Sequence, residues 1–287
     1  MPVATHVFRA ATIAVTLFSG ITHAEGIDSE HIFGFMIGSD VGDAGEREFQ
    51  TQTTGRFDKG AGRYHAGEQE FELELVPVEN FRIELGTAFA GHDIRDVAGL
   101  DDRRQLSWTG ASLDLRYRFL ARETAPFGMT FAVQSEGSRI DDISGAGAWR
   151  YGTTFTLAFD REIVPDFAIA ALNLSYQPEW TRFSSLAETE REVTVGAAFA
   201  LMAQFRPGIL LGGEARYFRH YDGFGLDALS GQALFIGPTA YFQLSERSRL
   251  TVSWSTQAWG RASGLRAGLD LANFEHHQAR LVFGVNF

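Results

Sequence analysis

The sequence predicts an all-β fold, an antiparallel transmembrane β-barrel of about 12 strands with short periplasmic turns and longer extracellular loops. Three observations favour this fold. The chain begins with the pattern of an export signal, apolar and polar residues alternate over most of the remaining sequence, and short and long connections follow one another in turn. Transmembrane strands show this alternation because one face meets lipid and the other faces a polar interior.

Residues 1–24 have the pattern of a secretory signal peptide. Arg9 precedes the apolar run Ala10–Phe18, and Thr22 and Ala24 are small residues at the positions that a signal peptidase reads. We expect cleavage after Ala24. A membrane anchor is the alternative, but the apolar run is shorter than the roughly 20 residues of a spanning helix.

Residues 25–45 precede the first strand that alternation predicts. They contain the short apolar run Ile32–Met36 within a mainly polar stretch. This run fits a short extra strand, and it also fits a segment tucked into the periplasmic mouth as a plug. We therefore treat 25–45 as a periplasmic N-terminal segment or plug, and 46–287 as the barrel.

The last predicted strand, His277–Phe287, shows the alternation most clearly. Its apolar face carries Leu281, Phe283, Val285 and the terminal Phe287, while its other face is mostly polar. A chain that ends in this way resembles the C-terminal signal of bacterial outer-membrane barrels. Phe283, Val285 and Phe287 are therefore predicted to form a membrane-insertion signal that the barrel-assembly machinery recognises.

Earlier stretches repeat the two-residue period around Phe71–Leu75, Phe81–Leu85, Tyr151–Phe159, Ala170–Tyr176 and Leu250–Thr256. Short connections fall near 77–80, 123–126, 164–166, 206–208 and 246–248. Longer and more polar connections fall near 58–61, 93–104, 136–146, 184–187, 220–231 and 261–272. Both ends of the barrel then lie in the periplasm, which requires an even number of strands.

Composition narrows the function classes. The chain has no cysteine, and its 36 Asp and Glu outnumber its 25 Lys and Arg, for a net charge of −11. An acidic balance without a basic stripe argues against a nucleic-acid partner. We expect outer-membrane lipid and lipopolysaccharide around the barrel, because several aromatic residues fall near strand ends, as in interfacial girdles.

Several stretches together resemble a family of uncharacterised proteobacterial outer-membrane barrels. They are GSDVGDAGERE, LDDRRQ, ETAPFGM, PEWTRF, LGGEARY and GQALFIGPTAYF. The resemblance runs from Ile32 to Phe287. It implies the barrel fold and a location in the outer membrane of a Gram-negative cell. Barrels of this style are loosely described as transporters without an assigned substrate, and the resemblance implies no catalytic residues.

The alternation points many charged side chains into the lumen. These are Glu68, Glu70, Glu72, Glu74, Arg82, Glu84, Asp114, Arg116, Arg118, Asp160, Glu179, Glu190, Glu192, Glu214, Arg216 and Arg280. They could line a water-filled channel with an acidic bias, which favours cations or polar solutes. Alternatively, Arg–carboxylate pairs could close the lumen, because buried charges must be paired.

Glu68, Glu70, Glu72 and Glu74 form an acidic row on one strand face. Like charges so placed repel one another unless cations lie between them. We expect Arg82, Arg116 or Arg118 as partners of this charge ladder. A cation site is the sharper alternative, but the sequence predicts no metal and no cofactor.

Histidine and serine give weaker signals. His276 and His277 are adjacent, so on a strand they would point to opposite faces and could not share a metal. A lipid-acting enzyme would need a pair such as His220 or His92 with Ser107, Ser175 or Asp93, but no local motif selects one and G-x-S-x-G is absent.

The sequence therefore favours passive, channel-like passage of small solutes. A closed structural barrel with working surface loops is the first alternative, and a lipid-acting enzyme is the second. An exported soluble β-protein would instead pack its apolar faces inward.

Overall fold

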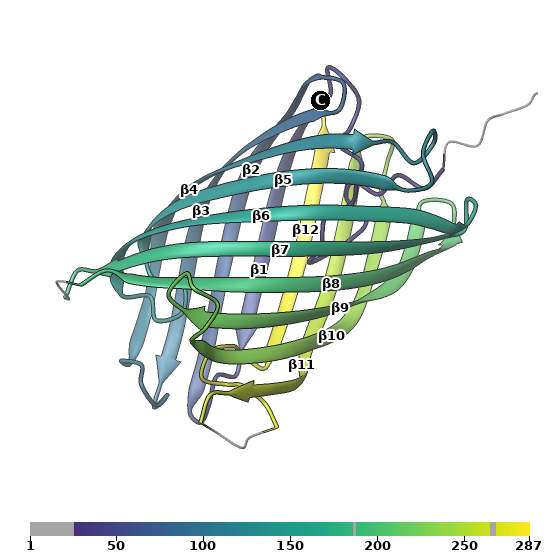
Figure 1. Cartoon of the computed structure of the whole chain (residues 1–287). Coiled ribbons are helices and arrows are strands. Elements are labelled where there is room, and N and C mark those ends of the chain that lie inside the picture. Colours follow the sequence, from purple (N-terminus) through teal and green to yellow (C-terminus); the bar gives the residue numbers. More distant parts are fainter. Residues whose placement is uncertain (1–25, 186–187, 265–267) are drawn as a thin grey trace, which may run out of the picture.

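Twelve antiparallel strands form a closed barrel in the computed structural model, which describes residues 26–185, 188–264 and 268–287 (Figure 1). The strands are β1 (Arg47–Phe57), β2 (Arg63–Val78), β3 (Phe81–Arg95), β4 (Arg103–Leu120), β5 (Gly128–Ile140), β6 (Gly147–Val164), β7 (Ala168–Phe183), β8 (Glu190–Arg206), β9 (Ile209–Asp222), β10 (Leu229–Gln243), β11 (Ser248–Ala262) and β12 (His277–Asn286). Each strand pairs with its neighbours in sequence, and β1 pairs with β12 to close the barrel. The predicted fold and strand number are confirmed. The predicted signal peptide lies outside the described residues.

The outer surface is apolar along the middle of the strands. On β11, Val252 and Trp254 are exposed, whereas the alternating residues Thr251, Ser253 and Ser255 are buried. β12 follows the same rule, with Leu281 exposed and Val282 buried. The two-residue period therefore points apolar side chains outward, as a lipid-facing barrel requires. Among the described residues, no helix is long and apolar enough to cross a membrane.

Several aromatic side chains also lie outward. Trp108, Tyr117, Trp149, Tyr151 and Phe287 are all exposed. Exposed aromatic side chains of this kind suit the boundary between lipid and water.

The two ends of the barrel differ. One end, here called the short-turn end, carries the turns β2–β3, β4–β5, β6–β7, β8–β9 and β10–β11, together with Phe287. Asn80, Asp166 and Gly208 adopt positive φ values of 64°, 56° and 76° there, which lets the strands reverse within a few residues. The other end, the long-loop end, carries the six remaining connections.

Two predicted loop boundaries were wrong. The connections expected at 136–146 and 220–231 are shorter, because β5 continues to Ile140, β9 continues to Asp222, and β10 begins at Leu229. Strands of 13 to 15 residues exceed the roughly 9–11 needed to cross a bilayer. Beyond the apolar belt both faces become polar, so the alternation that marks a strand disappears from the sequence although the backbone pairing continues.

Candidate functional site

Residues 26–45, here called the inner segment, lie inside the barrel at the short-turn end (Figure 1). No residue of the inner segment forms a strand. Its side chains Ile27, Ile32, Phe33 and Met36 are buried in one cluster with apolar residues of β7, β8 and β9, namely Ile169, Ala171, Ala200, Met202 and Leu210. The apolar run noted in the sequence thus packs against an apolar patch of the lumen wall.

Wall side chains hold the backbone of the inner segment. The carboxylate of Glu214 accepts hydrogen bonds from the amides of Gly34 and Phe35, at 2.6 and 2.9 Å. Asn173 accepts a hydrogen bond from the amide of Ile37 and donates one to its carbonyl, both at 2.9 Å. Four backbone groups that would otherwise be unsatisfied inside the barrel therefore have partners on β7 and β9.

A second anchor lies near the β4–β5 turn. Asp160 on β6 accepts a hydrogen bond from the amide of Ser39 at 2.6 Å and forms an ion pair with Arg122 at 3.0 Å. Asp40 pairs with Arg122 and with Arg118, the latter at 3.3 Å. Charges from the wall and the inner segment thus neutralise one another.

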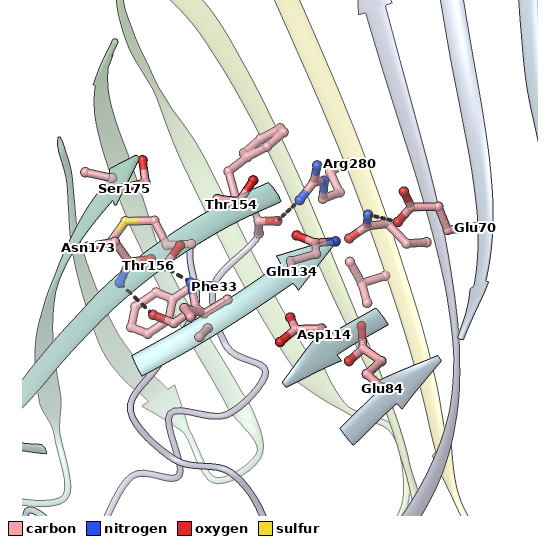
Figure 2. A pocket seen from close by; sticks show the side chains of 18 of the residues that line it. Phe33, Glu70, Glu84, Asp114, Gln134, Thr154, Thr156, Asn173, Ser175 and Arg280 are labelled. Carbon is pink, nitrogen blue, oxygen red and sulfur yellow. Dashed lines mark hydrogen bonds between the residues drawn. The ribbon is translucent and has the colours of Figure 1, made fainter. Parts of the chain in front are cut away.

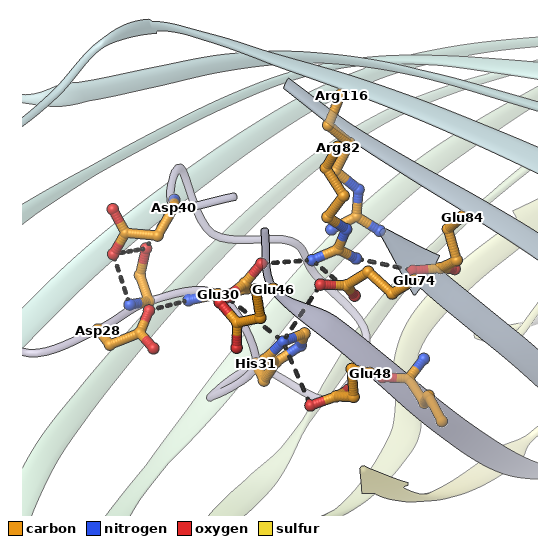
Figure 3. A network of polar contacts seen from close by, with 12 residues as sticks. Asp28, Glu30, His31, Asp40, Glu46, Glu48, Glu74, Arg82, Glu84 and Arg116 are labelled. Atoms are coloured by element: carbon orange, nitrogen blue, oxygen red, sulfur yellow. Dashed lines mark hydrogen bonds and ion pairs between the residues drawn. The ribbon is translucent and has the colours of Figure 1, made fainter. Parts of the chain in front are cut away.

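The third anchor is a charge network around Arg82 on β3 (Figure 3). Its guanidinium lies 2.9 Å from Glu30 of the inner segment, 3.1 Å from Glu74 and 2.8 Å from Glu84. His31 Nε2 lies 3.5 Å from Glu30. Burial, helped by the nearby guanidinium of Arg249, lowers the pKa of His31, while burial raises the pKa of Glu30. A neutral imidazole therefore fits this site.

Two loops fold inward at the long-loop end. Asp142 in the β5–β6 connection lies 2.9 Å from Arg56 on β1 and 3.1 Å from Arg150 on β6. In the β11–β12 connection, Asp270 is fully buried and Phe274 packs against Phe218, a residue of β9. Both connections thus contact the barrel wall from inside.

A polar cavity of about 380 Å³ (Figure 2) lies between the inner segment and the β5–β6 connection, which contributes Asp142 to its lining. Its lining includes Phe35 and Ile37 of the inner segment and Thr154, Thr156 and Ser175 of the wall. Charged side chains of both signs complete it. A space of this size accommodates water or a small solute.

The structure places the predicted lumen residues in three groups. The cavity is lined by Glu68, Glu70, Glu72, Arg82, Glu84, Asp114, Arg116, Arg216 and Arg280. The inner segment is contacted by Glu74, Arg118, Asp160 and Glu214, and also by Arg82 and Arg280. Towards the long-loop end, Glu179 pairs with Arg150, Glu192 lies beside His220, and Glu190 is exposed.

The expected partners of the acidic row are only partly the observed ones. Arg82 pairs with Glu74 as expected. Arg116 instead pairs with Asp114, and Arg118 with Asp40. Glu72 and Glu70 accept hydrogen bonds from Gln50 and Gln52, each at 2.5 Å, because the β1–β2 register places those glutamines directly opposite.

Sequence reasoning also missed Arg56, Arg122, Arg150 and Asn173. Arg56 and Arg122 lie on parts of the chain where the alternation gave no clear face. Asn173 lies on β7, and nothing in its own stretch of sequence indicates contact with the inner segment.

His276 and His277 are not kept apart as expected, and their positions allow a shared metal. Their ring centroids lie 3.9 Å apart, and both imidazoles have nitrogen atoms within 4.8 Å of each other and of an Asp58 oxygen. His276 precedes β12, so the two-residue rule of a strand does not govern it.

The histidines considered for catalysis have other partners. His220 Nδ1 lies 3.0 Å from the hydroxyl of Thr194, and His92 Nε2 lies 3.0 Å from the carbonyl oxygen of Asp142. Within the described ranges, neither imidazole forms a hydrogen bond with Ser107, Ser175 or Asp93.

Comparisons with known proteins agree with this architecture. A model described as a family of unknown function, DUF6662, matches residues 25–287. The chain belongs to this family. No curated protein matches the sequence of this DUF6662 member.

Solved structures similar to it are outer-membrane barrels. The COG4313 outer membrane channel from Pseudomonas putida F1 superimposes with a TM-score of 0.59 at 11% identity, covering 87% of this chain and 98% of that one. The NanC porin superimposes with a TM-score of 0.50 at 8% identity, covering 83% of this chain and 100% of that one. At such identities the likeness shows the fold.

Proposed function

We propose that this DUF6662 protein is an outer-membrane channel for small polar solutes, in which the inner segment limits passage. The observation that carries the proposal is the charged cavity of about 380 Å³ in the lumen, bounded at the short-turn end by the inner segment. A barrel that served only as a scaffold would gain stability from an apolar or fully paired interior, since buried charge is costly.

The outer surface supports the proposed location. An exposed apolar belt with aromatic residues suits a lipid bilayer and would aggregate in water. We propose insertion into the outer membrane, with lipopolysaccharide around the belt and with recognition of β12 by the barrel-assembly machinery through Phe283, Val285 and Phe287. A channel and a porin of the same fold are compatible with this location.

Displacement of the inner segment would open the short-turn end. Water can replace its hydrogen bonds and ion pairs with the wall when the segment leaves, whereas its apolar contacts with β7, β8 and β9 favour the docked position. Its only covalent continuation among the described residues is the connection to β1. The channel is therefore closed when the inner segment is docked and conducting when the segment is undocked.

Gly34 offers a direct test, because it lies against β11. A Cβ atom at Gly34 would lie 1.7 Å from Ser253 Oγ and 2.4 Å from Ser253 Cβ, so alanine cannot be accommodated without displacement. In a planar lipid bilayer, we expect rare openings of the refolded wild-type chain and at least about tenfold higher open probability for Gly34→Ala, which corresponds to ~1.4 kcal/mol.

The double variant Gly34→Ala/Ser253→Gly removes both clashing atoms and should restore the low open probability. Gly67→Ala is the control, because a Cβ there would meet only one atom, at 3.9 Å. If the wild type and Gly34→Ala both insert and stay silent, the channel proposal fails.

That silent outcome would favour a closed barrel whose outer loops form the working surface. One observation supports this second candidate: the inner segment and the inward-folded loops occupy opposite ends of the lumen.

A further inference from the structure

Two arginines on one side of the cavity have no carboxylate partner. The guanidinium carbons of Arg216 on β9 and Arg280 on β12 lie 3.9 and 4.8 Å from the ring centroid of Phe35. Arg216 donates to Gln278, and Arg280 donates to Thr54 at 3.1 Å and to the carbonyl of Gly34 at 3.3 Å. Within the described ranges, neither arginine belongs to an ion pair.

Arg216 is the more unusual of the two. It is only 6% exposed, and its Nε has no hydrogen-bond partner among the described residues. The nearby Glu214 accepts hydrogen bonds from Gly34, Phe35 and Thr239, and none from Arg216 within the described ranges. A buried guanidinium with a free donor is costly unless something else accepts its hydrogen bond.

The β2 side of the same cavity carries the opposite charge. Glu68, Glu70 and Glu72 line it, and in the described part of the chain none forms an ion pair. Glu70 and Arg280 both project into the cavity (Figure 2). In the described part of the chain, the lining charges that form no ion pair are thus acidic on β2 and basic on β9 and β12.

We infer that this cavity binds a small zwitterionic solute, with its carboxylate at Arg216 and Arg280 and its ammonium group at Glu68 and Glu70. The inference rests on the proposed function, because it names the solute class that the channel holds. Guanidinium groups bind carboxylates through paired donors, and an ammonium group offers three donors to carboxylate oxygens. A simple anion would satisfy one side and be repelled by the other, and so would a simple cation.

The test uses three solutes of matched size: 4-aminobutyrate, butyrate and butylamine. Isothermal titration of the detergent-solubilised full chain should give at least about tenfold tighter binding of 4-aminobutyrate than of the other two. Arg216→Gln should weaken 4-aminobutyrate and butyrate binding by about tenfold and leave butylamine binding unweakened. Glu70→Gln should weaken 4-aminobutyrate and butylamine binding and leave butyrate unweakened.

Arg219→Gln is the matched control, because Arg219 lies on β9 but is exposed. It should bind all three solutes as the wild type does. If Arg216→Gln does not refold, Arg216→Lys keeps the charge without the planar fork and should still weaken 4-aminobutyrate binding. Equal affinity for the three solutes, or a preference that survives Arg216→Lys and Glu70→Gln, would overturn the inference.

The titration needs no ion current, so the two proposals can fail separately. If the barrel binds 4-aminobutyrate but carries no current in the bilayer, the channel proposal fails and the proposed binding site stands. If the barrel conducts ions but binds the three solutes with equal affinity, the proposed binding site fails and the channel proposal stands.

Discussion

Arg82 on β3 and Glu30 of the inner segment form an ion pair with 2.9 Å between Nη1 and Oε1, and both side chains are almost fully buried. The same guanidinium also reaches Glu74 and Glu84 of the wall. Arg82 therefore joins the inner segment to two strands through one side chain. Removing one member of a buried charge network strongly destabilises the fold, because the remaining charges are then left uncompensated.

Replacing Arg82 should accordingly release the inner segment. Arg82→Gln leaves three buried carboxylates close together, and we expect a loss of about 3–5 kcal/mol in the free energy of unfolding. Urea unfolding in lipid vesicles measures this loss, and hydrogen exchange of residues 27–41 reports undocking. The matched control is Arg95→Gln on the same strand, whose side chain is 53% exposed. Wild-type protection of residues 27–41 in Arg82→Gln would contradict the role of this ion pair.

Asp142 predicts how the long-loop end responds to pH. Although burial opposes its charged form, the guanidiniums of Arg150 and Arg56 lower the pKa of Asp142. Because the pKa of Asp142 is lower in the folded state, its charged carboxylate stabilises the loop. This stabilisation is fully present above the ordinary aspartate pKa of about 3.9 and is lost as the pH falls towards the pKa of the folded state.

Asp142→Asn should therefore increase hydrogen exchange of residues 141–146 at pH 7, after correction for the intrinsic exchange rate. The difference between wild type and variant should shrink progressively below pH ~3.9. Asp101→Asn, an exposed aspartate of the β3–β4 connection, serves as the control. A difference that stays constant down to pH 2 would mean that the carboxylate charge is not what holds the loop.

The third prediction concerns the cost of placing a charge on the apolar outer surface. Leu157 on β6 lies on the outer surface between Phe131 and Leu174 of the adjacent strands. An arginine there would face the middle of the lipid layer, so Leu157→Arg should destabilise the barrel in vesicles by about 2–4 kcal/mol. Ile163→Arg lies on the same strand beside the short-turn end and should cost only about 0–1 kcal/mol. Equal costs at both positions would argue against the proposed membrane placement.

The sequence predicted the barrel because its signal is local. Leu250 and Thr251 already show which side of their strand is apolar, and no distant partner is needed to read that pattern. Even the parity of the strands follows from counting short and long connections. Glu70 and Arg216, which the alternation assigned to the inner face, both line the cavity.

The candidate site depends on relationships that no local pattern contains. Gly34 and Glu214 are 180 residues apart, and nothing near either residue indicates that they meet. The partners of the acidic row follow from the register between β1 and β2, which brings Gln50 opposite Glu72. His276 and His277 were misjudged because one lies just before the strand, and a boundary shift of one residue decides where an imidazole points.

The path of the inner segment bears on how the molecule can be assembled. Near its start the amide of Ile27 meets Glu162, beside the β6–β7 turn, and at its other end the amide of Glu46 donates to Asp43 just before β1. Both ends of the described segment therefore lie at the short-turn end of the barrel, and the residues between them form a loop inside the lumen. The wall can therefore close first, and the described segment can dock into it afterwards.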